Sequence, residues 1–279
     1  ARGWDAVDVV FVTGDAYVDH PSFAMAILHR VLEQAGFRVA MLSQPDWRSC
    51  EPWRQFGRPR LFFAISAGNM DSMINHYTAN KKVRNDDAYS PGGKIGLRPD
   101  RATLAYCQRA REAFPGVPVI AGGVEASLRR LAHYDYWSDT VKRSILLDAK
   151  ADLVVYGMGE HAIVDIARRL ATGQSVKNLR DMRGIAYVMG AKESNAACGL
   201  AESVRPQAAL VLPSFDEVRA DKVRFAEATR LIHINTSPFN AQTLIQFHDR
   251  QAVVVTPPPL PIGEAAMDAD YDLPYTRRP

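Results

Sequence analysis

Residues that could do chemistry gather in four short loops, each directly after a buried-looking apolar run. The loops start after residues 13, 66, 121 and 156; each carries an acidic side chain and reaches a glycine within two residues. The glycines could serve only tight strand-to-helix turns, but four such loops at one rim favour a ligand-binding crevice. The candidate binding residues in these loops are Asp15, Asp19, His20, Asn69, Gly122, Gly123, Glu125, Gly157, Gly159 and Glu160.

Two further segments combine charged, amide and aromatic side chains. Residues 67–100 have little periodicity and contain the candidate binding residue Lys81. A loop this long in a compact domain is usually functional or disordered. The segment is therefore expected to be either a ligand-facing lid or a loop docked on a neighbouring domain. Residues 129–137 begin with Arg129 and Arg130, whose forked guanidinium groups could hold a phosphate or carboxylate, or pair with nearby aspartates. Basic and aromatic residues together also suit single-stranded RNA, but no recognisable RNA-binding module is present, which argues against nucleic acid.

Several catalytic motifs are missing from the sequence. There is no G-x-x-x-x-G-K-[ST] phosphate loop and no G-x-G-x-x-G, and residues 64–68 lack the first glycine of a nucleophile elbow. Asp19-His20 and Glu160-His161 each place a histidine beside an acid, a pairing common by chance. We therefore assign neither a metal site nor any catalytic residue.

The elements that must position these loops alternate between strands and helices. Continuous apolar runs predict strands at residues 7–13, 37–42, 61–66, 117–121 and 153–156, with 185–188 as a weaker sixth. Helical stripes lie at 24–35, 103–114 and 163–170. The pattern predicts an α/β domain over residues 1–190, a doubly wound, mainly parallel sheet of five to six strands. Residues 191–279 are expected to form a helical and extended connector, with a loop at 191–199, a helix at 216–234 and an edge strand at 252–256.

Composition limits the class of protein. The 279 residues contain 47% hydrophobic and 23% charged residues, typical of a globular protein, and a net charge of +3 is too small to imply nucleic acid. The three cysteines, Cys50, Cys107 and Cys198, have no C-x-x-C spacing, which suits a cytoplasmic setting. No apolar run approaches the roughly 18 residues of a membrane span. Since the chain lacks an initiator Met, we expect it to be part of a longer protein.

Several motifs resemble a known family. AGGVEAS at 121–127 and DLVVYGMGE at 152–160 resemble the flavodoxin-like, cobalamin-binding-type domain in front of many radical S-adenosylmethionine (SAM) enzymes. More narrowly, TGDAYVDHPSF at 13–23, SAGNMDSM at 66–73, HYTANKK at 76–82 and YDLPYTRRP at 271–279 are similar to the N-terminal region of the YgiQ family of radical SAM proteins. The resemblance covers most of the chain and is weakest across residues 191–206.

The resemblance implies a domain that covers a radical SAM barrel lying outside this chain. In that family a C-x-x-x-C-x-x-C triad holds a [4Fe–4S] cluster that binds and cleaves SAM, and an electron donor must reduce the cluster. None of the three cysteines here matches the triad. The resemblance then implies that Asp15, Asn69, Lys81, Glu125, Arg129 and Glu160 orient substrate or close the barrel mouth.

Cobalamin is not favoured by the first loop. Domains that bind it through a lower axial histidine carry D-x-H-x-x-G, whereas here Tyr17 stands at the histidine position and His20 at the glycine position. Two other interpretations remain open: a stand-alone flavodoxin-like module that binds a nucleotide or small acid, and a structural domain whose polar loops contact a partner.

Overall fold

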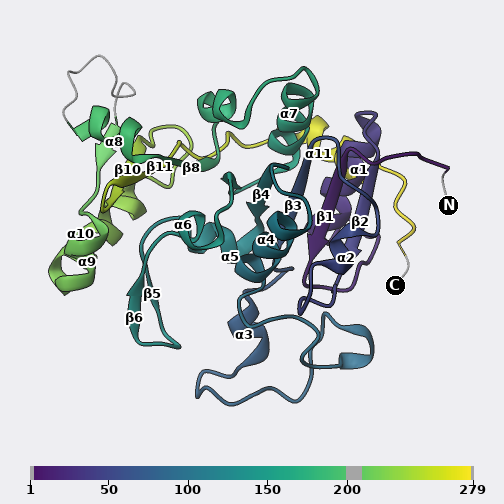
Figure 1. Cartoon of the computed structure of the whole chain (residues 1–279), viewed down its shortest axis with the longest axis horizontal. Helices are drawn as coiled ribbons and strands as arrows, with labels where there is room; N and C mark the ends of the chain where they lie inside the picture. Colours follow the sequence, from purple (N-terminus) through teal and green to yellow (C-terminus); the bar gives the residue numbers. More distant parts are fainter. Residues whose placement is uncertain (1–2, 199–208, 278–279) are drawn as a thin grey trace.

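The computed structural model describes residues 3–198 and 209–277 and shows an α/β fold built on one long sheet (Figure 1). Within these residues the sheet has nine strands in the order β2-β1-β3-β4-β7-β8-β11-β10-β9. This exceeds the predicted five to six strands because the segment beyond residue 190 adds three strands to the same sheet. A separate two-stranded hairpin, β5-β6, lies outside it.

Five neighbouring strands form a parallel half. They are β2 (Val39–Ser43), β1 (Val9–Thr13), β3 (Phe62–Ser66), β4 (Val119–Gly122) and β7 (Leu153–Val155). All five lie within or next to predicted strands, and β1 and β3 are buried along their whole length, as continuous apolar runs indicate. The order 2-1-3 places a reversal of strand order between β1 and β3, where the chain first moves to one side and then to the other.

The remaining strands form a mostly antiparallel half. They are β8 (Ile185–Met189), β9 (Ala209–Val211), β10 (Thr243–His248) and β11 (Gln251–Val255). β11 pairs with β8 on one side and β10 on the other, so the predicted edge strand is an interior strand and β9 forms the edge. The prolines after β11 therefore end an interior strand, whereas the sequence analysis took them as a sign that the strand before them lies at the edge of the sheet.

Helices cover both faces of the sheet. One core lies under α1 (Ala24–Gln34), α7 (Glu160–Ala171) and the 3-10 helix at Val176–Asp181. The opposite core lies under α2 (Glu51–Arg54), α4 (Ala102–Ala113), α5 (Gly123–Leu128) and α6 (Ile145–Ala149). Adjacent residues of β1 point into opposite cores, Val10 into the second and Phe11 into the first. This is the doubly wound arrangement that the sequence predicts.

Two further segments beyond residue 190 differ from the sequence expectations. Where the sequence predicts a loop at 191–199, the structure has the helix α8 (Ala191–Cys198), and residue 199 lies outside the described residues. The predicted helix at 216–234 is two helices, α9 (Phe215–Ala220) and α10 (Lys222–Ile234). Asp221 separates them because its extended backbone ends α9 while its side chain accepts a hydrogen bond from the Val223 amide, 2.8 Å away, and caps α10.

The long stretch after β3 is ordered and extends below the sheet in Figure 1. It contains α3 (Ser72–His76) and a short 3-10 turn at Pro91–Gly93. Its near neighbour is the hairpin of β5 (His133–Asp135) and β6 (Thr140–Lys142). Lys81 joins the two: its Nζ donates to the Trp137 carbonyl at 3.2 Å and lies 4.9 Å from the centre of the Tyr136 ring. The stretch thus docks on the hairpin of its own chain.

The chain end returns across the molecule as a C-terminal strap, residues 263–277. It begins with α11 (Glu264–Tyr271), which contacts α1, and continues through the buried residues Leu273 and Tyr275. The Thr276 amide then donates to the Asp19 carboxylate at 3.0 Å, and the Arg277 amide donates to the Asp19 carbonyl at 2.9 Å. The strap therefore ends at the loop after β1. None of the helices in the described residues is both long and apolar enough to cross a bilayer.

Candidate functional site

A cavity of about 270 Å³, called the crevice here, opens at the carboxyl ends of the parallel strands. Because β1, β3, β4 and β7 run parallel, three of the four loops predicted to carry ligand residues lie around it. Its floor is apolar and includes Phe11, Leu28 and Ile120. The predicted residues that line it are Asn69, Gly122, Gly123, Gly157, Gly159 and Glu160.

The rim of the crevice needs glycine at two positions in particular. Gly123 has φ +78°, and a Cβ there would lie 2.7 Å from Ser66 Oγ. Gly68 has φ +116°, and a Cβ there would lie 2.1 Å from a carboxylate oxygen of Asp15. Both values are far below van der Waals contact, so these glycines let adjacent loops approach closely.

Asp15 lies beside the crevice but uses its carboxylate to hold loops together. It accepts from the Asn69 amide at 2.6 Å and pairs with Arg98 at 2.8 Å. Burial raises the pKa of Asp15, while the Arg98 charge opposes that rise. Arg98 is fully buried and also binds both carboxylate oxygens of Asp87 at 3.1 and 3.2 Å and the Ala67 carbonyl at 3.1 Å. The predicted acid is thus part of a buried ion cluster.

Asp19 and His20 lie away from the crevice. Asp19 pairs with Arg30 and holds the strap through Thr276, and the hydrogen bond from Arg30 lowers the pKa of Asp19 to about 2. The His20 Nδ1 accepts from the Ser22 amide at 3.1 Å. Asp19, in the loop after β1, therefore stabilises the C-terminal strap.

The other predicted charged residues brace helices. Glu125 is buried and accepts from the Ser72 amide at 2.9 Å and the Thr103 amide at 3.0 Å, so it satisfies the starts of α3 and α4. Arg129 pairs with Asp71, which caps α3.

Arg130 stacks on a neighbouring aromatic ring instead of facing the crevice. Its guanidinium lies 4.5 Å from the centre of the Tyr156 ring, and burial lowers the pKa of Arg130. Like Lys81, it makes its contacts within the chain. None of Lys81, Glu125, Arg129 and Arg130 is among the residues that line the crevice.

The crevice has few groups for acid-base or metal chemistry. Among its described lining residues Glu160 is the one ionisable side chain, accompanied by the polar Ser66 and Asn69. The described residues contain no cluster of three metal-binding side chains. This arrangement suits an uncharged, flat or apolar group held between glycine-rich loops.

The described residues fit neither an iron–sulfur cluster nor cobalamin bound through an axial histidine. Cys50 and Cys107 are buried, burial raises the pKa of the Cys107 thiol, and the Cys198 side chain lies outside the described residues. No thiol described here is therefore placed to bind an iron–sulfur cluster. Tyr17, at the axial-histidine position of cobalamin domains, bonds to His29 Nδ1 at 2.8 Å, and no histidine lines the crevice within the described residues.

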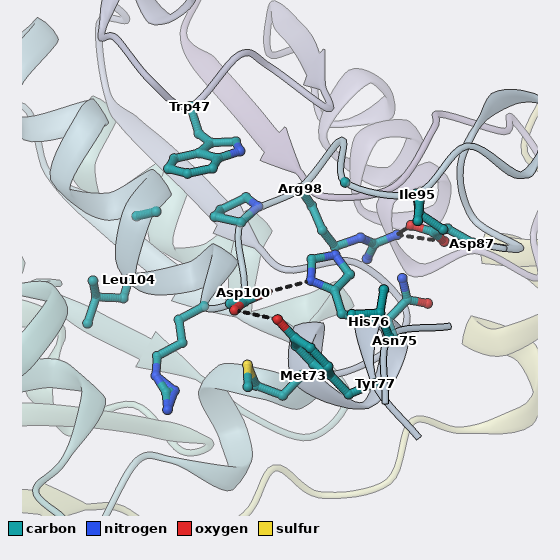
Figure 2. A pocket seen from close by; sticks show the side chains of 15 residues that line it. Trp47, Met73, Asn75, His76, Tyr77, Asp87, Ile95, Arg98, Asp100 and Leu104 are labelled. Atoms are coloured by element: carbon teal, nitrogen blue, oxygen red, sulfur yellow. Dashed lines mark hydrogen bonds and ion pairs between the residues drawn. The ribbon is translucent and has the colours of Figure 1, made fainter. Parts of the chain in front are cut away.

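A second cavity, of about 630 Å³, is called the loop cavity here and was missed by sequence analysis. It lies between α3, residues 83–101 and the start of α4, with Trp47 on one wall (Figure 2). Inside it, Asp100 accepts from Tyr77 Oη and binds His76 Nδ1, both at 2.9 Å. The HYT motif at 76–78 was noted in the sequence, but nothing there indicated that Asp100 would meet it.

Comparison with known proteins identifies the family of this chain. The family model described as "Radical SAM N-terminal" matches residues 1–279. UPF0313 proteins of Rhodopseudomonas palustris and Geobacter sulfurreducens are 52% and 53% identical over 99% and 100% of the chain, covering 42% and 44% of their own lengths. The UPF0313 protein YgiQ of Escherichia coli is 44% identical over 99% of the chain and 43% of its own length. The chain thus spans less than half the length of these relatives.

A solved structure gives a weaker likeness. The radical SAM methyltransferase TsrM from Kitasatospora setae, solved with tryptophan substrate and a SAM analogue, has a TM-score of 0.40 and 17% identity over 64% of this chain and 28% of its own. The family match and the curated relatives, which agree over the whole chain, decide the assignment. The chain belongs to the radical SAM N-terminal family and is similar over its whole length to the UPF0313 (YgiQ) proteins.

Proposed function

We propose that this chain is the N-terminal domain of a radical SAM enzyme of unknown substrate, and that its crevice edge covers the catalytic barrel and contributes to the substrate side. The observation that carries the proposal is the exposed apolar surface at the crevice mouth. Val124 and Met158 line the crevice and are 47% and 45% exposed, and Leu128, at the far end of the same helix as Val124, is 62% exposed. Exposed apolar side chains grouped around a cavity are typical of an interaction site.

Two further observations support this orientation. The C-terminal strap ends at Asp19, in the loop after β1, so the last described residues lie at the same carboxyl edge of the sheet as the crevice, although away from its lining. The relatives are more than twice as long as this chain, which leaves room for a catalytic domain. In this proposal the [4Fe–4S] cluster and SAM are bound by residues outside the chain, and an external donor reduces the cluster.

The first test is the gene sequence beyond the codon for Pro279. We expect a C-x-x-x-C-x-x-C triad within the next few tens of codons, as the resemblance to the YgiQ family implies. A stop codon or an unrelated domain would overturn the proposal. It would favour the stand-alone binding module, which the crevice at the strand-order reversal also suits. Nucleotides and cobalamin would then be tested directly for binding to this chain.

A surface variant tests the role of the crevice edge in the full-length, reconstituted protein. Leu128→Asp places a charge on the exposed apolar end of α5, whereas Val223→Asp, at an exposed apolar residue of α10, is the control. We expect Leu128→Asp to increase hydrogen exchange in residues 122–129 and 156–160 and to lower 5′-deoxyadenosine formation. Equal exchange and activity in the two variants would mean that this edge does not face the barrel.

A further inference from the structure

Asp100, on the wall of the loop cavity, has only neutral hydrogen-bond partners among the described residues. Its two oxygens bind the Tyr77 hydroxyl and His76 Nδ1, each at 2.9 Å. A carboxylate can only accept hydrogen bonds, so both partners donate to it, and with a neutral imidazole both are uncharged. No lysine or arginine of residues 3–198 and 209–277 forms an ion pair with Asp100. This wall of the cavity therefore carries a negative charge that lacks an ion-pair partner in the described chain.

The Asp100 carboxylate is open to a ligand. Its side chain is 54% exposed, and Figure 2 shows the carboxylate near the centre of the lining residues. A carboxylate offers roughly four acceptor positions, so each oxygen can accept a further hydrogen bond beside the one from His76 or Tyr77. Those two hydrogen bonds also fix the orientation of the carboxylate. The group is thus accessible, oriented and able to accept from a donor.

The cations of the lining do not compensate this charge. Arg98 is fully buried and binds both carboxylate oxygens of Asp87, and Arg101 pairs with Asp135 outside the cavity at 2.8 Å. Neither guanidinium forms an ion pair with Asp100. An anionic ligand would therefore find both arginines already paired and would be repelled by Asp100.

The rest of the wall is mainly apolar. It includes the Trp47 ring and the side chains of Val83, Ile95 and Leu104. A metal ion needs several ligand atoms, and the described part of the chain holds no cluster of three metal-binding side chains. A neutral apolar molecule would remove water from Asp100 without replacing its hydrogen bonds. An ammonium group carried on an apolar body suits both the carboxylate and the wall.

We propose that the loop cavity binds an organic cation, a primary ammonium group carried on an aromatic or aliphatic body. The ammonium group donates to the Asp100 carboxylate, and the body packs against the Trp47 ring and Leu104. The volume of about 630 Å³ lies in the range of small-molecule sites. The inference goes beyond the proposed function, because it rests on the residues around the loop cavity and does not depend on how the crevice is used.

The test titrates the full-length protein with 2-(2-naphthyl)ethylamine, followed by saturation-transfer NMR of the compound. The titration is done at about pH 8, where an alkylammonium group keeps its proton and an ordinary imidazole is neutral. The matched probe is 2-(2-naphthyl)ethanol, which has the same ring and chain but no charge. The comparison of the two compounds therefore isolates the effect of the positive charge.

Three variants locate the binding site. Asp100→Asn removes the charge of the proposed partner, and the control Asp86→Asn removes the charge of an exposed aspartate in the same stretch. Ala105→Phe fills the cavity from α4 and leaves every charged group in place. Thermal unfolding verifies that each variant folds.

For a ligand of this size we expect a dissociation constant of about 1 mM for the amine. The alcohol should bind about tenfold more weakly, because it cannot form an ion pair with Asp100. Asp100→Asn should bind the amine as weakly as the alcohol, Asp86→Asn should change nothing, and Ala105→Phe should abolish the binding of both compounds.

The proposal is overturned if the wild type does not distinguish amine from alcohol, which includes the case in which neither binds. It is also overturned if Ala105→Phe or Asp100→Asn keeps the wild-type affinity for the amine, since the compound would then bind elsewhere. An equal loss in Asp86→Asn and Asp100→Asn would also overturn it, because it would indicate attraction to surface charge in general. The comparison of the two compounds and Ala105→Phe decide the matter even if Asp100→Asn does not fold.

Discussion

The Arg98 guanidinium lies 2.8 Å from the Asp15 carboxylate and joins two segments that are far apart in the sequence. Asp15 belongs to the loop after β1, whereas Arg98 stands near the end of the long stretch after β3. The same guanidinium binds Asp87, in the middle of that stretch, and the Ala67 carbonyl at its beginning. One buried side chain thus fastens a stretch of about thirty residues against the carboxyl edge of the sheet.

Replacing Arg98 by methionine should strongly destabilise the domain. The variant Arg98→Met leaves two buried carboxylates without their counter-charge, which typically costs about 3–5 kcal/mol. The control Arg84→Met removes an exposed arginine of the same stretch that contacts only the Ile74 carbonyl, and it should change stability by no more than about 0.5–1 kcal/mol. Urea unfolding measures both. Equal losses would mean that the buried cluster does not hold the stretch.

The strap contact at Asp19 should make stability depend on acidity. The pKa of Asp19 is about 2 in the folded chain against 3.8 ordinarily, so between these values the unfolded state binds more protons. Its contribution of roughly 2 kcal/mol is complete above about pH 5 and lost as the pH falls toward 2. Asp19→Asn should flatten this part of the curve. Asp268→Asn, at an exposed residue of α11, should leave it unchanged; the same slope in all three proteins would contradict the assignment.

The glycine at the crevice rim can be tested against a glycine in open space. Gly123 and Gly173 have φ values of +78° and +84°, but a Cβ at Gly173 would meet nothing within 4 Å. Gly173→Ala should cost only the backbone strain of about 1–2 kcal/mol. Gly123→Ala should cost clearly more, because its Cβ also displaces Ser66. If chemical unfolding gives the same loss for both, Ser66 yields freely and the crevice is not closely packed there.

Substituting Glu125 distinguishes a structural role of this residue from a role in binding. Glu125→Ala leaves the Ser72 and Thr103 amides buried without acceptors, which should cost about 2–5 kcal/mol. Both amides should also exchange faster with deuterium. Glu112→Ala, at an exposed position of α4, is the matched control. If full-length Glu125→Ala protein kept normal stability but formed less 5′-deoxyadenosine, Glu125 would instead belong to the substrate side proposed for this domain.

The parallel half of the sheet was predictable because its strands are buried on both faces and read as unbroken apolar runs. Of the three added strands, β11 is such an apolar run and was predicted as an edge strand, whereas β9 and β10 lack that pattern. β9 has only three residues, and β10 carries Gln246 and His248 in buried positions. The Gln246 amide is satisfied by the Ala132 amide and the Pro213 carbonyl, contacts made by residues distant in sequence. The polar residues of β10 therefore kept the sequence analysis from predicting this strand, which tertiary contacts stabilise.

The sequence predicted the position of the crevice rim better than it predicted the roles of the side chains there. Three of the four glycine-rich loops line a crevice, because glycines occur where strands end and chains approach closely. Polar residues were less informative, because a glutamate or an arginine such as Glu125 or Arg129 can either bind a ligand or stabilise a helix, and its residue type does not distinguish the two roles. The cluster around Arg98 and the pair of His76 with Asp100 depend on the path of the long stretch, which has no periodic pattern to predict it.

The strap that ends at Asp19 also has a mechanical meaning. A pull on Arg277 would be carried first by the Asp19 hydrogen bonds and then by the loop after β1. The strands β9, β10 and β11 make neither of these contacts, although they lie nearer to the strap in sequence. Tension or rotation applied at Arg277 would thus reach β1, whose Phe11 lines the crevice, before it reached the far edge of the sheet.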